Sequence, residues 1–293
     1  MAFTRRQCLV LASSVFVAAH ARAEAGLLAA REVAVPDAGP FGKKCLLLRP
    51  TRAPEDQPLP LLVLLHGLGE TDREALGIHA WQDRYGLPEA YARLVAPPVT
   101  RTLPSKRYLS DARLLEINDE LRRAPLPDLA LVCPFTPNPF KQSPSAPLLD
   151  RYAGYLEHAL LPAVRAATPT LPGPEHCGID GVSLGGYVAL EIFLRKPELF
   201  GVVGTMQGAF GKQLAEVYAR RLADVVAKYG GRRIHVTTTT FDPFREASEL
   251  LAQRLAERGV ARTLTLAEGP HDQNFLREAG SLEMLLFQAR ALV

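Results

Sequence analysis

The sequence predicts an α/β fold, in which a mostly parallel sheet of about eight strands carries helices on both faces. Short apolar or β-branched runs alternate along the chain with segments whose apolar residues recur at helical spacing. Such alternation builds right-handed strand–helix–strand units, and these place parallel strands in one sheet. Leu61–Leu65 is apolar at every position, which is typical of a strand buried on both faces. With 293 residues, 47% of them apolar, residues 24–293 suffice for a single domain with a large core.

The first half of the domain begins with a strand expected at residues 43–49, followed by a proline-rich loop that leads to Leu61–Leu65. Residues 70–128 are harder to interpret, because prolines at 88, 97, 98, 104, 125 and 127 interrupt helical patterns over 81–95 and 111–123. The segment is consistent either with a lid or insertion over a site, or with a crossover helix and a long surface loop.

The second half repeats the strand–helix alternation more regularly. Residues 233–240 are rich in β-branched side chains, which favours a strand, and Gly259 is a natural end for the helix before it. Strands are expected at 129–133, 176–180, 201–206, 233–240 and 261–266, and helices at 152–160, 187–196, 214–229, 247–258 and 282–289.

Residues 1–23 have the three parts of an export signal. Arg5 and Arg6 precede an apolar run over residues 8–19, and small residues follow at 21–23, at cleavage spacing. The paired arginines resemble a twin-arginine signal, and the run is shorter than the about 20 apolar residues that span a bilayer. We therefore expect an exported protein, periplasmic or secreted, without stable membrane insertion. The alternative is a frayed N-terminal helix of a cytosolic protein.

The charge and the cysteines narrow the function classes. Without the three arginines of residues 1–23, basic and acidic residues are equal in number, so charge gives no support for nucleic-acid or membrane-surface binding. Cys8 would leave with the signal, and Cys45, Cys133 and Cys177 allow at most one disulfide. Cys133 and Cys177 lie in expected core strands, where a thiol is more often a small buried hydrophobe. No zinc, phosphate-loop or dinucleotide motif occurs, and we expect neither a metal nor a cofactor.

The central motif is Gly-x-Ser-x-Gly at Gly181, Ser183 and Gly185, between an expected strand and an expected helix. This context is typical of a nucleophile elbow, in which a strained serine projects above the sheet and the following helix points its positive end toward it. The alternative is an ordinary glycine-rich turn. In a nucleophile elbow, the amide of Leu184 would supply one hydrogen-bond donor to the oxyanion. The turn after Leu61–Leu65 would supply the other, from Leu68 or from Gly67.

Two more strand ends carry the remaining groups of a catalytic triad. Asp242 follows the strand at 233–240, and His271 follows the strand at 261–266. Because parallel strands end at one edge of a sheet, these groups should gather near Ser183. Ser183 would be the nucleophile, His271 its base and Asp242 the partner of His271, and protonation of the base predicts loss of activity below about pH 6–7.

Other candidate side chains rank lower. We expect His66 to brace the oxyanion turn and His235 to be a core histidine, while His79 and Trp81 could line a pocket. The remaining rivals to the triad residues are Asp272, His158 and His176.

These motifs together resemble the α/β-hydrolase superfamily, and more narrowly the esterase D, feruloyl-esterase-like and polyhydroxybutyrate-depolymerase-like group. The resemblance depends on residues 62–69, the elbow at 178–186, Asp242 and the Gly269–Asp272 segment, where the group often has Gly-Gly-His-Asp and this chain has Gly-Pro-His-Asp. It implies cofactor-free hydrolysis of a small-molecule or polymer-linked carboxylic ester through an acyl-enzyme. The alternatives are an acyltransferase or a serine peptidase on the same fold, or a non-catalytic binding protein.

Overall fold

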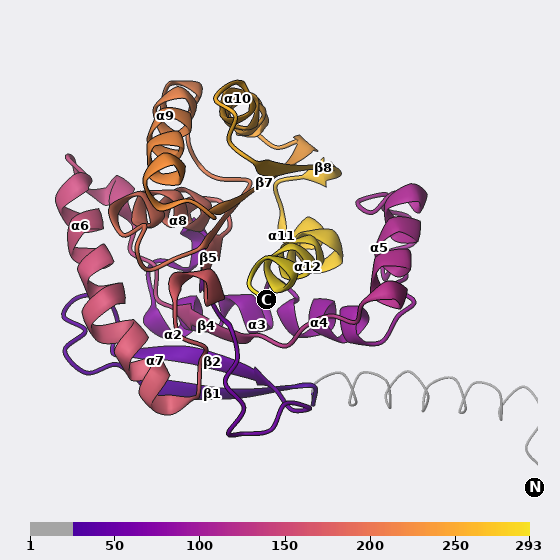
Figure 1. The fold of residues 1–293 in the computed structure, drawn as a ribbon, viewed down its shortest axis with the longest axis horizontal. Helices are drawn as coiled ribbons and strands as arrows, with labels where there is room; N and C mark the ends of the chain where they lie inside the picture. The colour runs from indigo at the N-terminus through magenta and orange to yellow at the C-terminus, as the bar shows by residue number, and fades with distance from the viewer. Residues whose placement is uncertain (1–25) are drawn as a thin grey trace, which may run out of the picture.

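The computed structural model describes residues 26–293, so the export signal expected over residues 1–23 lies outside the described residues. Eight strands form one sheet at the centre of the described chain (Figure 1). They are β1 (Leu28–Ala34), β2 (Lys44–Pro50), β3 (Leu61–Leu65), β4 (Ala130–Pro134), β5 (Cys177–Gly181), β6 (Val202–Met206), β7 (Arg233–Phe241) and β8 (Arg262–Pro270).

The sheet has the order β1-β2-β4-β3-β5-β6-β7-β8. The strands β3 to β8 run parallel, whereas β2 pairs antiparallel with both β1 and β4. The predicted eight-stranded, mostly parallel sheet is therefore confirmed. β5, which leads to Ser183, lies in the middle of the sheet between β3 and β6.

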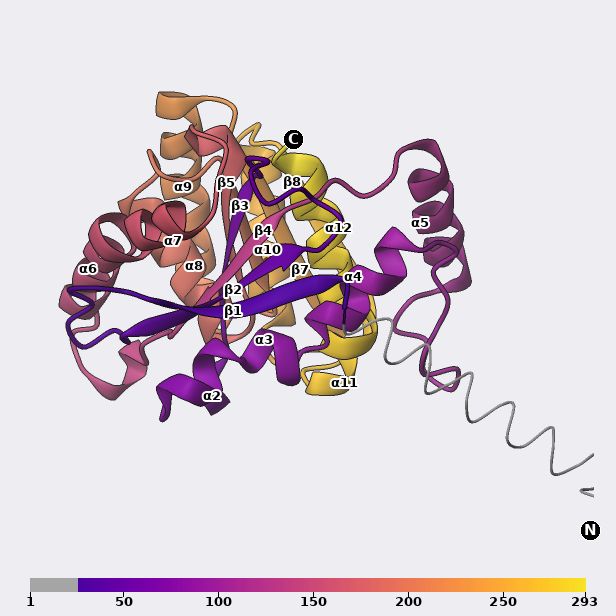
Figure 2. The ribbon, with the colours of Figure 1, turned by 90° about the horizontal axis from the view of Figure 1, so that it is seen from below.

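Helices cover both faces of the sheet (Figures 1 and 2). Alternate residues of β3 enter the two cores: Leu61, Val63 and Leu65 pack on one side and Leu62 and Leu64 on the other. The first core is closed by α6 (Ala146–Tyr155), η3 (Leu156–Leu160), α7 (Leu161–Ala167), α8 (Leu184–Arg195), α9 (Lys212–Tyr229) and α10 (Arg245–Glu257). The second is closed by α2 (Glu74–Ile78), α3 (Ala80–Asp83), α4 (Leu87–Val95), α5 (Asp111–Arg123), α11 (Gln273–Phe275), η5 (Leu276–Gly280) and α12 (Ser281–Ala291).

Most expected elements lie close to where the sequence places them, and the differences include the following three. β1 was not expected, because it is a mostly exposed edge strand whose short apolar run is interrupted by Arg31 and Glu32. β8 continues to Pro270, four residues past its expected end, and so reaches the loop of His271. The helix expected at 152–160 is longer, and its π-helical turn η3 comes just before Pro162, which has no N–H to continue the α-helical pattern.

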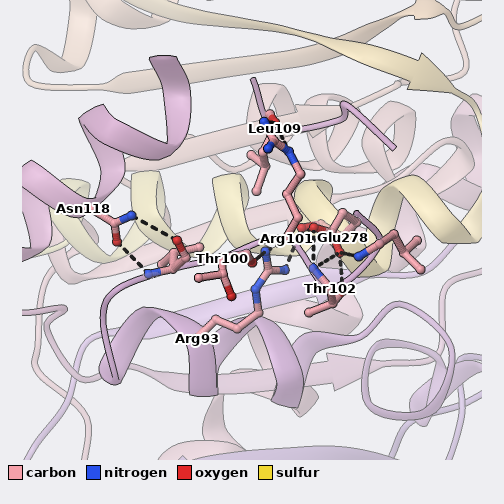
Figure 3. Close-up of polar contacts among 9 residues, drawn as sticks. Arg93, Thr100, Arg101, Thr102, Leu109, Asn118 and Glu278 are labelled. Atoms are coloured by element: carbon pink, nitrogen blue, oxygen red, sulfur yellow. Dashed lines mark hydrogen bonds and ion pairs between the residues drawn. The ribbon is translucent and has the colours of Figure 1, made fainter. Parts of the chain in front are cut away.

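The segment 70–128 is the crossover from β3 to β4 and packs on the second core. Figure 3 shows how its loop is fastened to η5. The buried carboxylate of Glu278 accepts hydrogen bonds from the amide of Thr102 at 3.0 and 3.1 Å and from the Thr102 hydroxyl, and it pairs with Arg93 at 3.4 Å. The Asn118 side chain exchanges two hydrogen bonds with the backbone of Val99. These contacts favour the crossover interpretation over the lid.

The helix α5 of this crossover is joined to α12 by ion pairs, Arg113–Glu283 at 2.7 Å and Arg290–Glu120 at 3.0 Å. It stands beside α12 and away from β5 (Figure 1). Among the described residues, none of the helices combines the length and the apolar character that crossing a membrane requires.

A glycine substitution tests the packing of the elbow on β3. A Cβ at Gly185 would overlap the carbonyl oxygen of Leu65 and lie 2.7 Å from that of His66, and neither backbone group can move freely. We expect Gly185→Ala to lower the free energy of unfolding by about 1–3 kcal/mol in urea denaturation.

Gly154→Ala is the matched control. A Cβ there meets nothing within 4 Å, and the residue lies inside α6, so the substitution should stabilise the protein by about 0.5–1 kcal/mol. Equal effects of the two substitutions would contradict the packing described.

Candidate active site

Ser183 lies at a strained turn between β5 and α8. Its backbone has φ +56° and ψ −116°, a region that residues other than glycine rarely adopt. Two backbone hydrogen bonds hold it there: its N–H donates to Met206 at 2.9 Å, and its carbonyl accepts from Ala209 at 2.9 Å. A Cβ at Gly181 would overlap the backbone of Gly185, so the turn requires glycine at this position of the motif.

Asp242 and His271 meet at the ends of β7 and β8. The Asp242 carboxylate is fully buried, and its Oδ1 lies 2.9 Å from Nδ1 of His271. Two further donors hold it, the hydroxyl of Thr238 at 2.7 Å on Oδ2 and the amide of Phe244 at 3.1 Å on Oδ1. A buried carboxylate needs such donors to remain charged. The imidazole of His271 is 24% exposed, so one edge of the ring is open to the site.

Ser183 and His271 line the same surface cavity, whose volume is about 220 Å³. Asp242 lies behind His271, so the structure brings the three predicted side chains to one edge of the sheet. The cavity is lined by Gly67, Leu68, Gly69, Glu70, Arg84, Tyr85, Val182, Ser183, Gln207, His271, Asp272, Gln273 and Leu276. Within the described part of 70–128, only Glu70, Arg84 and Tyr85 contribute to it.

The two expected oxyanion donors begin helices. Leu184 is the first residue of α8, and Leu68 is the first residue of η1 (Leu68–Glu70), a short 3₁₀ helix directly after β3. The amide of Gly67 donates to the hydroxyl of Tyr85 at 3.1 Å, so it is already engaged. Of the two amides considered on this turn, that of Leu68 is therefore the better candidate.

His66 braces this turn, as expected. Its Nε2 accepts the amide of Thr136 at 2.9 Å, so the ring hydrogen is on Nδ1 and is donated to the carbonyl of Gly67, also at 2.9 Å. The residue is fully buried, and this burial lowers the pKa of His66 to about 4. His66 is therefore neutral at physiological pH.

The other histidines are placed away from the cavity. His235 is buried against Phe287, with ring centres 4.2 Å apart, as expected for a core histidine, and burial lowers its pKa to about 3. His158 pairs with Glu157 on the surface, and His176 binds the carbonyl of Leu292. Asp272 lines the cavity, but its carboxylate caps α11 by accepting the amide of Phe275 at 2.8 Å.

His79 and Trp81, which the sequence offered only as possible pocket residues, do not line this cavity. Trp81 is fully buried in the second core, where its ring meets that of Tyr85 edge to face. His79 pairs with Glu32 at 3.2 Å, between α2 and β1. A tryptophan at helical spacing is more often a core residue, and Trp81 lies in the core here.

Sequence reasoning missed Gln207, which follows β6 with φ +49° and is almost fully buried at the cavity. Its side-chain amide donates to the hydroxyl of Thr239 at 2.9 Å and to the carbonyl of Pro270 at 3.1 Å. Gln207 thus links the strand behind Ser183 to the loop that carries His271. A lone glutamine after a short strand gives no motif from which this role could be predicted.

The described residues contain no cluster of three or more histidine, cysteine or acidic side chains that could hold a metal ion. Cys45, Cys133 and Cys177 are buried free thiols within β2, β4 and β5, so the disulfide allowed among them is not formed in the structure. Burial raises the pKa of Cys45 and of Cys177 to about 12, which makes these thiols poor nucleophiles.

Comparison with known proteins gives a partial family match and a shared fold. Residues 136–279 match the family model Esterase, described as a putative esterase. A ferulic acid esterase superposes with a TM-score of 0.62 at 16% identity, over 90% of this chain and 98% of that one. The S-formylglutathione hydrolase of Staphylococcus aureus gives 0.59 at 15% identity, over 89% and 96%.

The enterobactin esterase of Shigella flexneri gives a TM-score of 0.56 at 17% identity, and covers 91% of this chain but only 60% of its own. A search of curated proteins found no match to this sequence. At such low identities the structural likeness establishes the shared α/β-hydrolase fold, and the family match indicates ester hydrolysis.

The neutral His66 makes stability depend on pH in a definite direction. Its pKa in the folded protein is below its usual value of 6.5, so the unfolded chain takes up the proton first as the pH falls. The stabilisation is present above about pH 6.5 and is lost toward pH 4. Urea denaturation of the wild type and of His66→Asn at pH 7 and 4.5 should show the advantage of the wild type shrinking by about 2–3 kcal/mol on acidification. Parallel pH profiles would contradict a buried neutral His66.

Proposed function

We infer that this chain is an esterase that works through an acyl-enzyme formed on Ser183, on the basis of its fold and of the esterase family match over residues 136–279. The observation that supports this most directly is the pair of His271 and the buried Asp242, with His271 and Ser183 in one cavity. The proposed substrate is a small-molecule or polymer-linked carboxylic ester.

The orientation of His271 assigns its two nitrogens. Nδ1 faces the carboxylate of Asp242, so it carries the hydrogen, and Nε2 has its lone pair free to accept a proton. Nε2 takes the proton of the Ser183 hydroxyl as the oxygen attacks the ester carbonyl, and Asp242 stabilises the imidazolium that forms. Without such a base, a serine hydroxyl is a weak nucleophile at neutral pH.

Attack converts the ester carbonyl into a tetrahedral intermediate with a negatively charged oxygen. The amides of Leu184 and Leu68 are the proposed donors to that oxygen. His271 then returns its proton to the leaving alcohol, the carbon–oxygen bond breaks, and an acyl group remains on Ser183. A water molecule, deprotonated by His271, releases the acid by the same steps in reverse order.

Three alternative functions are compatible with this geometry, two of them catalytic and one non-catalytic. An acyltransferase would prefer an alcohol to water as acyl acceptor, and a serine peptidase would cleave amides. A non-catalytic binding protein would keep the cavity without turnover. A panel of esters with aliphatic, aryl and cinnamoyl groups, run beside matching amides and with added alcohols, separates the three.

We also propose that the protein is exported to the periplasm or beyond. This proposal rests only on the signal-like sequence of residues 1–23.

Ser183→Ala tests the nucleophile. A fluorophosphonate probe should label the wild type, and the substitution should abolish both labelling and ester turnover, because the attacking oxygen is lost. Ser105→Ala, at an exposed position, is the control and should leave both unchanged. Labelling that survives in Ser183→Ala would place the nucleophile elsewhere.

Asp242→Asn tests the partner of the base. The asparagine keeps an acceptor for Thr238 or Phe244 but cannot hold the His271 hydrogen on Nδ1, so kcat should fall by about 10³–10⁴-fold with the fold retained. Asp272→Asn keeps a good helix cap and should change kcat little. Steady-state kinetics and circular dichroism of both variants decide the point. Near-normal turnover in Asp242→Asn would identify another acid.

A further inference from the structure

We propose that Tyr85 is a positioning residue for the oxyanion hole, which it holds in place through the amide of Gly67. This inference depends on the proposed function, because it assumes that an oxyanion forms at Ser183. The structure offers two observations for it: both backbone polar groups of Gly67 are held by buried side chains, and the side chain that holds the amide is itself fixed by buried contacts.

The carbonyl of Gly67 is held by His66. Nδ1 of His66 donates to it at 2.9 Å, and the opposite ring nitrogen is fixed by the amide of Thr136. In a trans peptide the C=O and the following N–H point in opposite directions. Fixing the Gly67 carbonyl therefore fixes the direction of the Leu68 N–H, which points away from His66.

The amide of Gly67 is held by Tyr85. A tyrosine hydroxyl has one hydrogen, and that of Tyr85 is donated to the carboxylate of Glu70, so its oxygen is free to accept the Gly67 N–H at 3.1 Å. Burial, together with the nearby charge of Glu70, raises the pKa of Tyr85 far above its usual range, so the hydroxyl keeps its hydrogen. A Cβ on Gly67 would lie 3.2 Å from this hydroxyl, which shows how closely the two groups approach.

Tyr85 cannot follow the turn if the turn moves. Its ring is almost fully buried and packs edge to face on Trp81, with ring centres 5.2 Å apart. Its carbonyl accepts the hydroxyl of Ser281 at 2.7 Å, which ties it to the start of α12. Without the Tyr85 hydroxyl, the buried amide of Gly67 would lose its partner, and the turn would shift to satisfy it.

The same contacts involve a negative charge, that of Glu70, close to the proposed oxyanion site. Glu70 is 3% exposed and lines the cavity, so its negative charge opposes the charge that develops on the substrate oxygen. Arg84 pairs with it at 3.1 Å from the solvent side and offsets that effect. A carboxylate so close to an oxyanion site is unfavourable for catalysis by itself, and orienting the Tyr85 hydroxyl is a role that accounts for it.

Tyr85→Phe is the test, and Tyr91→Phe is its matched control. Tyr91 is also buried, lies on the same crossover and donates its hydroxyl to an aspartate, Asp128 at 2.9 Å, away from the cavity. We expect kcat of Tyr85→Phe to fall by about tenfold with KM changed less than twofold, a smaller effect than removal of a whole oxyanion donor. Tyr91→Phe should leave kcat and KM unchanged.

Two inhibitors separate positioning from a general loss of structure. A trifluoromethyl ketone, which forms a tetrahedral oxyanion on the serine, should bind Tyr85→Phe about tenfold more weakly. An ether analogue of the substrate has no carbonyl and should bind both proteins equally. If the ketone binds as tightly as to the wild type, the proposal is wrong. If both inhibitors weaken equally, Tyr85 acts on substrate binding and the proposal is also wrong.

Substitutions of Glu70 give an independent check should Tyr85→Phe fold poorly. Glu70→Gln keeps an acceptor for the Tyr85 hydroxyl and should retain ketone affinity within about threefold, whereas Glu70→Leu should lose about tenfold. Equal affinity in both variants would overturn the proposal. Failure of the proposed function has a different signature, because Ser183→Ala would then keep its turnover and its fluorophosphonate labelling.

Discussion

The close approach of the elbow to the end of β3 is the constraint on which the site depends. Gly185 packs its backbone against the carbonyl groups of Leu65 and His66, at a distance that leaves no room for a side chain. This contact sets the start of α8 beside the turn at Gly67 and Leu68. The strained backbone of Ser183 is tolerable because hydrogen bonds to Met206 and Ala209 hold the turn from the other side.

Around this contact, irregular segments are held by buried polar side chains. Tyr85 and the adjacent His66 hold the turn after β3, and Gln207 holds the loop before His271. Farther from the cavity, Glu278 of η5 holds the crossover loop at Thr102. Irregular backbone at the edge of a sheet has no strand partners, so side chains must satisfy its polar groups. At the same edge of the sheet, His271 and Asp242 lie within a hydrogen bond of each other, and His271 shares a cavity with Ser183.

The sequence could predict those parts of the fold and site that local rules determine. A five-residue glycine pattern between a strand and a helix predicted the elbow, and the rule that parallel strands end at one edge predicted that Asp242 and His271 would gather near Ser183. β1 escaped prediction because it is an exposed edge strand, in which Arg31 and Glu32 interrupt the apolar residues of Leu28–Ala34.

Tyr85 and Gln207 escaped prediction for another reason. Each acquires its role only when segments far apart in the chain meet, and no local pattern carries that information. The same holds for residues 70–128, where proline spacing left two interpretations open. The contacts of Glu278 with Thr102, 176 residues apart in the chain, favour one of them.

The three thiols inside the sheet show which interactions hold the domain together. Cys45, Cys133 and Cys177 lie unpaired in three different strands, and no covalent cross-link joins any two of the described segments. The described residues are therefore held together by packing, hydrogen bonds and ion pairs, and their folding does not require a disulfide to form.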